Sequence, residues 1–411
     1  MGLPIADRLA SPAGRTSLFY FTLFLVPAMA NPYLPIWLSE QGISKEQIGT
    51  INAAPIFVMI VLNIIVGRIA DRASDWRQVI IFGAIFGCLA PAGLFFVEGF
   101  WPILLVWSLI VLPFQAISPV VDAATLRMCR RIGVEFGKVR LWGTLGFTAA
   151  TIPAGFLFGW FGAAIFVPMI LVASLIRAAT SLQLPLFRSA QGAQPKLIDP
   201  HAEIEPINPL IATKLKELWR PWFLLPLIGA ALVHGSHMLQ MSFGALLWSE
   251  QGVSPAVIGL LWAVAPASEV VIMLYFTPLA KRFSARHLIL ASCVFALVRW
   301  VGFSMEPPIW GYALLQILHL GSFALGYMGI VNFIANWTSE DIAAQAQSVF
   351  VMIRQIVTVI ALSSFGFIVA SIGTNAFLVA GGIAVAGGVL IFISLMLMSP
   401  KRELSETSGS T

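Results

Sequence analysis

Six charged side chains lie within, or at the ends of, long apolar runs of this sequence. They are Asp122, Arg140, Arg177, Glu269, Arg299 and Arg354. A charge in the middle of a membrane helix costs about 2.5–3.5 kcal/mol on insertion scales, so each one needs a partner, a water cavity or a function. A desolvated carboxyl group holds a proton near neutral pH, and an arginine fork binds a carboxylate or hydroxyl through two hydrogen bonds. These residue types therefore suit the binding of a proton and of a polar solute.

Glu269 is the only carboxylate well within an apolar run of the C-terminal half, so it is our first choice for a proton-coupling site. The alternative is a permanent ion pair with Arg299. Asp122 and Arg140 form a second candidate pair, which either holds its charges until substrate competes for them or serves only the structure. We expect Arg177 to reach the membrane interface by snorkelling.

Neutral side chains add further candidates for substrate binding. Asn31 precedes Pro32 and either binds substrate or satisfies the backbone carbonyl that the proline leaves free. His237 and His319 are the other polar candidates, although a buried histidine is often only a hydrogen-bond partner. His234 and His237 lie three residues apart, but two histidines without a third ligand do not predict a metal site.

The composition requires these residues to be positioned by membrane helices. Of 411 residues, 58% are hydrophobic and 10% are charged, whereas soluble proteins have about 45–50% and about 25%. This excludes a soluble enzyme. Twelve apolar runs have the length of a membrane helix, about 20 residues. They lie near 17–39, 47–70, 78–97, 102–126, 141–160, 163–185, 222–248, 255–280, 286–305, 309–336, 345–371 and 374–398.

An internal repeat divides the twelve runs into two groups of six. WLSEQGISKEQIG at 37–49 recurs as WSEQGVSPAVIG at 248–259, with Glu40, Gly42 and Gly49 repeated 210 positions later. Parallel repeats of this kind place a substrate site between two bundles that rock against each other. The sequence predicts an N-terminal bundle at 1–185, a cytoplasmic linker at 186–220, and a C-terminal bundle with a short tail at 221–411.

The basic residues predict the orientation. Of the 24 Lys and Arg residues, 20 fall in the termini and in the loops on one side, while the loops on the other side hold only Lys45. By the positive-inside rule, both termini are cytoplasmic. The excess positive charge is therefore a topology signal, and no nucleic-acid partner is expected.

Two N-terminal segments carry a resemblance to a known family. GRIADR at 67–72 resembles the loop signature of the major facilitator superfamily, and EFGKVRLWGTLGF at 135–147 looks like the start of the fifth helix in its phenylpropionate-transporter and lactose-permease branch. The signature implies gating roles for Gly67, Asp71 and Arg72. In that superfamily the glycine allows close helix packing, and the Asp and Arg lock the cytoplasmic gate in one state.

Segments of the C-terminal half resemble the phenylpropionate-transporter family more closely, at 234–252, 258–271, 297–303 and 314–326. The resemblance implies that Asp122, Arg140, Arg299 and His319 bind substrate, with His319 as a further proton-coupling candidate. Phe147 stands where lactose permease has its sugar-stacking Trp, which weakens a galactoside interpretation but keeps an aromatic face.

Two residues depart from the permease pattern around His319. The permease carries a Lys three residues before its histidine and a Glu three residues after it. Here those positions are Gln316 and Ser322, so the His–Glu pair of the permease is absent from this helix. Either the coupling site has moved to Glu269 or Asp122, or the coupling is not proton-based.

We therefore predict an all-α major facilitator fold of twelve transmembrane helices in two pseudo-symmetric bundles. We expect a monomeric, proton-coupled symporter in a bacterial inner membrane that imports a small organic solute such as a phenylpropionate-type aromatic acid. The alternatives are a sugar or nucleoside symporter, a drug–proton exporter, and a non-transporting receptor or scaffold. The sequence has no GxxxxGK[ST] loop and no hydrolase motif, so no enzyme activity and no cofactor is expected, and a proton gradient is the expected energy source.

Overall fold

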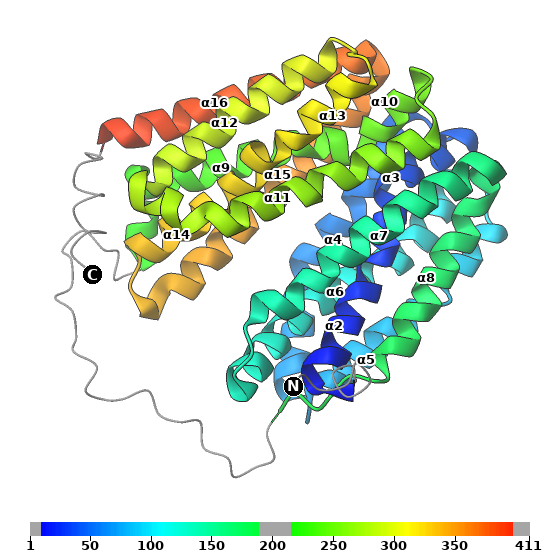
Figure 1. The fold of residues 1–411 in the computed structure, drawn as a ribbon, viewed down its shortest axis with the longest axis horizontal. Coiled ribbons are helices and arrows are strands. Elements are labelled where there is room, and N and C mark those ends of the chain that lie inside the picture. The colour runs from blue at the N-terminus through cyan, green and yellow to red at the C-terminus, as the bar shows by residue number, and fades with distance from the viewer. Residues whose placement is uncertain (1–9, 189–214, 398–411) are drawn as a thin grey trace, which may run out of the picture. The chain divides into compact units, whose positions relative to one another are not determined.

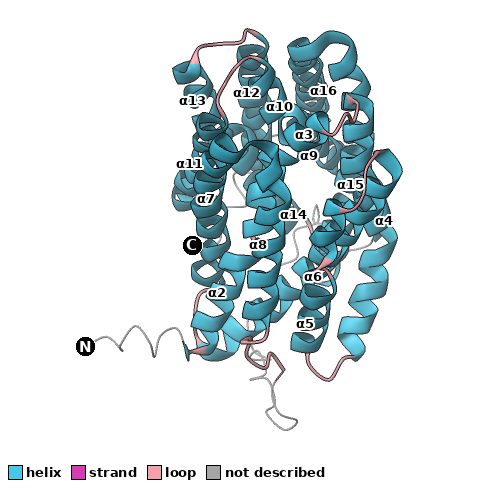
Figure 2. Ribbon diagram, turned by 90° about the vertical axis from the view of Figure 1, so that its right-hand side faces the viewer, coloured by secondary structure: helices cyan, strands magenta, loops and turns pink. Residues whose placement is uncertain are grey.

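The computed structural model describes residues 10–188 and 215–397, and this part of the chain is helical without a strand (Figure 2). Most of the linker predicted at 186–220, and the C-terminal tail after 397, lie outside the described residues. In chain order the elements, with 3-10 and π segments labelled η, are α2 Pro12–Leu23, α3 Leu25–Glu40, α4 Lys45–Arg72, α5 Trp76–Phe86, η1 Ala90–Phe95, α6 Phe100–Ile132, α7 Phe136–Phe161, η2 Gly162–Ile165, α8 Phe166–Ser181, η3 Leu215–Trp219, α9 Pro221–Leu239, η4 Gln240–Gly244, α10 Ala245–Glu250, α11 Pro255–Arg282, α12 Ala285–Ser304, α13 Ile309–Ile317, η5 Leu320–Leu325, α14 Gly326–Trp337, α15 Glu340–Ile372, η6 Gly373–Asn375 and α16 Ala376–Leu397.

These elements make twelve membrane crossings. Ten helical stretches of the described chain are long and apolar enough to span a membrane, and two of them, Phe136–Ser181 and Gln345–Leu397, hold 46 and 53 residues. A short 3-10 turn divides each of the two long stretches, at Gly162–Ile165 and at Gly373–Asn375. Since about 20 residues cross a bilayer, each makes two crossings. The predicted twelve-helix, all-α fold is confirmed.

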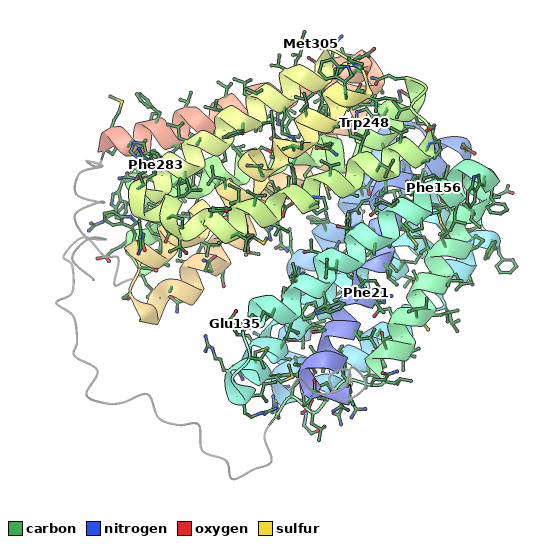
Figure 3. All side chains as sticks on the ribbon, in the orientation of Figure 1. Phe21, Glu135, Phe156, Trp248, Phe283 and Met305 are labelled. Carbon is green, nitrogen blue, oxygen red and sulfur yellow. The ribbon has the colours of Figure 1, made fainter. Side chains whose placement is uncertain are left out.

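The helix surfaces match an apolar solvent. Large apolar side chains such as Phe156 and Met305 project from the bundles, whereas Trp248 is fully buried (Figure 3). Exposed apolar side chains this numerous would be a liability in water and are what a lipid environment requires. The chain is a multi-pass membrane protein.

The described helices form two compact units. The first holds the described N-terminal part, through α8, together with Gln240–Ala263 and Leu362–Ser371 (Figure 1). The second holds the remaining C-terminal elements, in which α16 packs along both α9 and α12. The predicted bundle limits at 185 and 221 flank the undescribed segment and stay a prediction.

The two repeat loops have the same backbone conformation. Gly42 and Gly252 both adopt a positive φ, 74° and 83°, which a glycine reaches without steric cost. In the first copy the amide of Ile43 donates to the carbonyl of Leu38, and in the second copy the amide of Val253 donates to the carbonyl of Trp248. This is the hydrogen-bond pattern of a helix that ends in a Schellman motif, so the predicted repeat is a repeat of structure.

The end of the first unit that carries these loops, here called the repeat end, is held by backbone contacts across glycines. A Cβ atom on Gly366 would lie 2.7 Å from the carbonyl oxygen of Lys45, and one on Gly49 would lie 2.7 Å from that of Leu362. These contacts join α4 to α15, and only residues without a side chain allow helices to approach this closely.

A second glycine contact joins α7 to α11 in the same way. A Cβ atom on Gly155 would lie 2.6 Å from the carbonyl oxygen of Pro255, and one on Gly259 would lie 2.8 Å from that of Thr151. Gly259 is the repeat mate of Gly49, so the repeat extends to the helix packing.

Two polar contacts cross the same end. The ammonium of Lys45 lies 2.9 Å from the carboxylate of Glu250, and the Tyr33 hydroxyl donates to the carbonyl of Pro255 at 3.1 Å. The ion pair is partly exposed, so we expect it to contribute little to stability, about 0–1 kcal/mol. The glycine packing is therefore the main constraint at the repeat end.

We predict that Gly366→Leu opens the repeat end, because its side chain would overlap the backbone of α4 at Lys45. The measurement is disulfide formation between cysteines introduced at Lys45 and Glu250, which we expect to be slowed at least about tenfold. The matched control is Gly382→Leu, since a Cβ at Gly382 meets nothing within 4 Å. Equal crosslinking rates in the two glycine variants would show that the contact does not hold this end closed.

Candidate functional site

The guanidinium of Arg299, on α12, is fully buried in the second unit and anchors a hydrogen-bond network. Its Nε donates to the carbonyl of Leu315 at 2.8 Å, and its Nη2 donates to Oε1 of Gln316 at 2.9 Å. Its Nη1 donates to Nδ1 of His319 and to Oγ of Ser322, each at 3.0 Å. All four acceptors come from the segment Leu315–Ser322, so one arginine ties α12 to the α13–η5 region.

Glu269, on α11, joins this network through His319. The Nε2 of His319 lies 2.9 Å from the Glu269 carboxylate. An arginine N–H can only donate, so Nδ1 of His319 must accept, and the proton of a neutral imidazole is then on Nε2. His319 therefore donates to Glu269 and connects the carboxylate to the Arg299 charge.

His237, on α9, extends the network on its other side. Its Nδ1 lies 2.8 Å from the carbonyl of Val233, so Nδ1 carries a proton, and Nε2 accepts from the Ser322 hydroxyl at 3.0 Å. Ser322 in turn accepts from Arg299. The result is a continuous chain from Glu269 to His237 that links four helices.

Two π-helical segments lie beside these histidines. Gln240–Gly244 begins three residues after His237, and Leu320–Leu325 begins directly after His319. A π segment inserts an extra residue into a turn and is frequent at functional sites. Here it changes the direction of the side chains that follow each histidine.

The first unit contains the other predicted charge pair. Asp122, on α6, lies 3.5 Å from Nε of Arg140, on α7, and also accepts a hydrogen bond of 2.6 Å from the Tyr20 hydroxyl, on α2. The Arg140 guanidinium lies over the rings of Tyr20 and Phe24, at 5.3 and 4.6 Å from their centroids. Both charged side chains are partly exposed.

The remaining predicted site residues do not join these clusters. Asn31 is half-buried in α3, which also contains Pro32 and Pro35, and half-buried Phe147 lies in α7. Their predicted roles in substrate binding stay predictions.

The gating motif lies at the end of α4. Gly67 is half-buried, and a Cβ there would meet nothing within 4 Å, so the close packing implied by the resemblance is not seen in the described chain. Arg72 is exposed, and the side chain of Asp71 lies outside the described side chains.

Asp75, a nearby buried carboxylate, holds the loop that follows this motif. It caps α5 by accepting from the amide of Arg77, and it also accepts from the amides of Phe187 and Arg188. The sequence analysis missed this role, because both partners at 187–188 are distant in sequence.

The prediction that Arg177 snorkels to the interface is wrong. The side chain is fully buried, lies 5.9 Å from the Phe114 ring centroid, and none of its guanidinium nitrogens has a hydrogen-bond partner among the described residues. Its helix, α8, packs against α2, α3 and α5, and this removes the route to the interface.

Sequence reasoning also missed the partners of the predicted charges. Tyr20 carries no signal in sequence. Gln316 and Ser322, in contrast, flank His319 at i−3 and i+3, a spacing that places side chains on one helix face. That spacing could have marked both residues as candidate hydrogen-bond acceptors for the Arg299 guanidinium.

Comparison with known proteins assigns the family. The family model described as "MFS_1 like family" matches residues 14–359. The chain belongs to the MFS_1 like family. It is a secondary transporter of the major facilitator type, and neither the family nor the relatives below are enzymes.

Curated relatives of this family member carry different solutes. It is 28% identical over 345 residues to the "Probable 3-phenylpropionic acid transporter" of Escherichia coli (strain K12), covering 80% of this chain and 84% of that protein. It is 27% identical over 340 residues to the maltose permease of Geobacillus stearothermophilus, covering 81% of each chain.

A solved structure shows the fold. The crystal structure of the nucleoside transporter NupG superposes with a TM-score of 0.77 at 16% identity, covering 95% of this chain and 99% of that one.

We predict that Arg299→Gln destabilises the protein by about 3–5 kcal/mol, because it leaves Glu269 and its polar neighbours buried without the compensating charge. The measurement is thermal unfolding of the purified chain in detergent. The matched control is Arg130→Gln, which changes an exposed arginine at the end of α6 and should stay within about 0.5 kcal/mol of wild type. Equal unfolding midpoints for the two variants would contradict the role given to Arg299.

Proposed function

We propose that this transporter is a proton-coupled symporter that imports a small aromatic carboxylic acid of the phenylpropionate type. The observation that carries the proposal is the chain from Glu269 through His319 to Arg299, which places a proton-binding group next to a buried positive charge.

The coupling follows from charge balance in this network. With Glu269 ionised, the carboxylate compensates the charge of Arg299 through His319. A proton on Glu269 removes this compensation and leaves a net positive charge in an apolar site, which favours the entry of an anion. A bound carboxylate and a bound proton would therefore stabilise each other, and this mutual stabilisation is what symport requires.

The aromatic acid is supported by the relative that is called a probable 3-phenylpropionic acid transporter, and by aromatic rings around the network. The ring of Phe323 stacks on His319 with centroids 4.9 Å apart and also contacts His237. We further propose that the protein is a monomer in a bacterial inner membrane with both termini in the cytoplasm, so that the repeat end faces outward.

A second candidate substrate is a sugar or a nucleoside. The Asp122–Arg140 pair, with Tyr20 as a third polar group, could bind hydroxyl groups, and a maltose permease is among the relatives. Competition by maltose and uridine against uptake of the labelled acid separates the two candidates.

We predict that an imposed pH gradient, with the outside acidic, drives uptake of labelled 3-phenylpropionate into proteoliposomes. One proton per anion makes the transport electroneutral, and one pH unit supplies about 1.4 kcal/mol, which supports about tenfold accumulation. Initial rates are taken after subtracting protein-free vesicles, because the neutral acid also crosses lipid. Uptake that is indifferent to the gradient would refute proton coupling.

We predict that Glu269→Gln removes the gradient-driven part of this uptake but keeps exchange of internal for external substrate, because the amide imitates a permanently protonated side chain. The matched control is Glu98→Gln, at an exposed carboxylate before α6, which should behave like wild type. Gradient-driven uptake that survives in the Glu269 variant would remove Glu269 from the coupling mechanism.

A further inference from the structure

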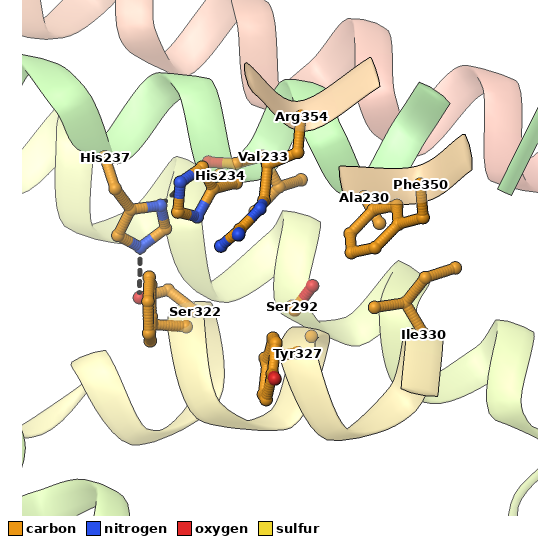
Figure 4. A pocket seen from close by; sticks show the side chains of 12 residues that line it. Ala230, Val233, His234, His237, Ser292, Ser322, Tyr327, Ile330, Phe350 and Arg354 are labelled. Carbon is orange, nitrogen blue, oxygen red and sulfur yellow. Dashed lines mark hydrogen bonds between the residues drawn. The ribbon is translucent and has the colours of Figure 1, made fainter. Parts of the chain in front are cut away.

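A small cavity lies inside the second unit, beside the network but separate from its carboxylate. It is bounded by residues of α9, α12, η5, α14 and α15, and its lining includes His234, Arg354 and Tyr327 (Figure 4). The space open to the centre of a water molecule is about 20 Å³. A cavity of at least about 10–15 Å³ admits one water, so this one accepts a single polar group of that size.

Among the described lining residues, the one formal charge is the positive charge of Arg354. Arg354, on α15, and His234, on α9, both face the cavity, and none of the described residues that line it is acidic. The buried Nε of Arg354 has no hydrogen-bond partner among the described residues. The side chain as a whole is half-buried, and its buried N–H loses hydration at a cost that is recovered when an anion or another acceptor meets it.

Neutral side chains complete the lining. Ser292 lies at the cavity wall, and the Tyr327 ring borders the cavity with its hydroxyl directed away from Arg354 (Figure 4). Tyr327 is 51% exposed, so the cavity reaches the surface of its unit at this side chain. Phe323 and Phe350 supply aromatic walls, and the Phe323 ring lies 5.8 Å from the His234 ring.

The cavity also touches the Glu269 network. His237 and Ser322, which are joined by a hydrogen bond, are part of its lining (Figure 4). A group bound in the cavity therefore lies against the two residues that end the chain from Glu269.

We propose that Arg354 and His234 form a carboxylate-binding site that takes the carboxylate group of an organic acid, with the rest of the molecule outside the cavity. This inference rests on the proposed function and adds the anchor of the transported anion, which is distinct from Arg299. Arg299 donates hydrogen bonds to groups of its own unit, whereas Arg354 lines the cavity and its Nε has no hydrogen-bond partner among the described residues. A planar guanidinium suits a carboxylate because it donates two parallel hydrogen bonds.

The test compares binding of 3-phenylpropionate with that of 3-phenylpropan-1-ol, which has the same ring and chain but no charge. Thermal shift and calorimetric titration of the full-length protein in detergent give both dissociation constants. We expect wild type to prefer the acid, and Arg354→Gln to weaken acid binding roughly ten- to a hundredfold with little change for the alcohol. A misfolded variant would lose both ligands, so the ratio of the two constants reports the anion site.

Three further variants sharpen the result. Arg354→Lys keeps the charge without the fork and should bind the acid with intermediate affinity. Tyr327→Phe removes a hydroxyl that points away from Arg354 and should leave the ratio of the two constants unchanged. Arg130→Gln, at an exposed arginine outside the cavity, should bind like wild type.

The outcomes separate this inference from the proposed function. If wild type transports the acid and Arg354→Gln binds it with unchanged affinity, the carboxylate site is refuted and the proposed function stands. If acid binding depends on Arg354 but no acid enters proteoliposomes, the site stands and the proposed function fails. A wild type that does not distinguish the acid from the alcohol overturns the site.

Discussion

A guanidinium that is buried among apolar helices must keep its hydrogen bonds, and Arg299 meets this constraint with acceptors taken almost entirely from one neighbouring segment. Because each lost bond to a charged donor costs about 1.5–3 kcal/mol, the position of the segment Leu315–Ser322 relative to α12 is tightly constrained. His319 and Ser322 each keep one hydrogen-bond donor, which His319 directs to Glu269 and Ser322 directs to His237. The polar chain of the second unit is therefore a consequence of satisfying one charge.

Arg354 and Arg177 show two other results of the same constraint. Arg354 lines a small cavity, and its buried Nε has no hydrogen-bond partner among the described residues, which is why the carboxylate site is proposed there. Arg177 is fully buried against the Phe114 ring, and its guanidinium nitrogens have no hydrogen-bond partner among the described residues. The three arginines have the same chemistry, and only their surroundings distinguish a structural anchor from a candidate ligand site.

The repeat end shows which properties an internal duplication preserves. Gly49 and its mate Gly259 both mediate close helix contacts, since a backbone approach depends only on the absence of a side chain. The ion pair is not duplicated. The repeat mates of Lys45 and Glu250 are Pro255 and Glu40, and Glu40 is exposed. Packing at this end follows the symmetry of the repeat, while the charges have diverged.

Much of the fold could be predicted from sequence because its signals are local. Hydropathy marks each helix, and the glycines of the two SEQG segments end helices in the same way at Gly42 and Gly252. The residue types at Asp122, Arg140, Glu269 and Arg299 identified the charges that need partners. Every membrane helix must be apolar whatever its neighbours are, so hydropathy and residue type can be read without knowing how the helices are arranged.

The partners themselves were decided only by tertiary structure. The sequence left Glu269 with a choice between a free proton site and Arg299, and the structure connects it to Arg299 through His319, which lies on a different helix. The reason is geometric. Successive side chains on a helix differ in direction by about 100°, so the rotation of each helix decides which neighbours His237 and His319 face, and the π segments change the direction of the side chains that follow them. Sequence alone determined which groups are charged and roughly how deep they lie, while helix rotation and packing decided what each of them meets.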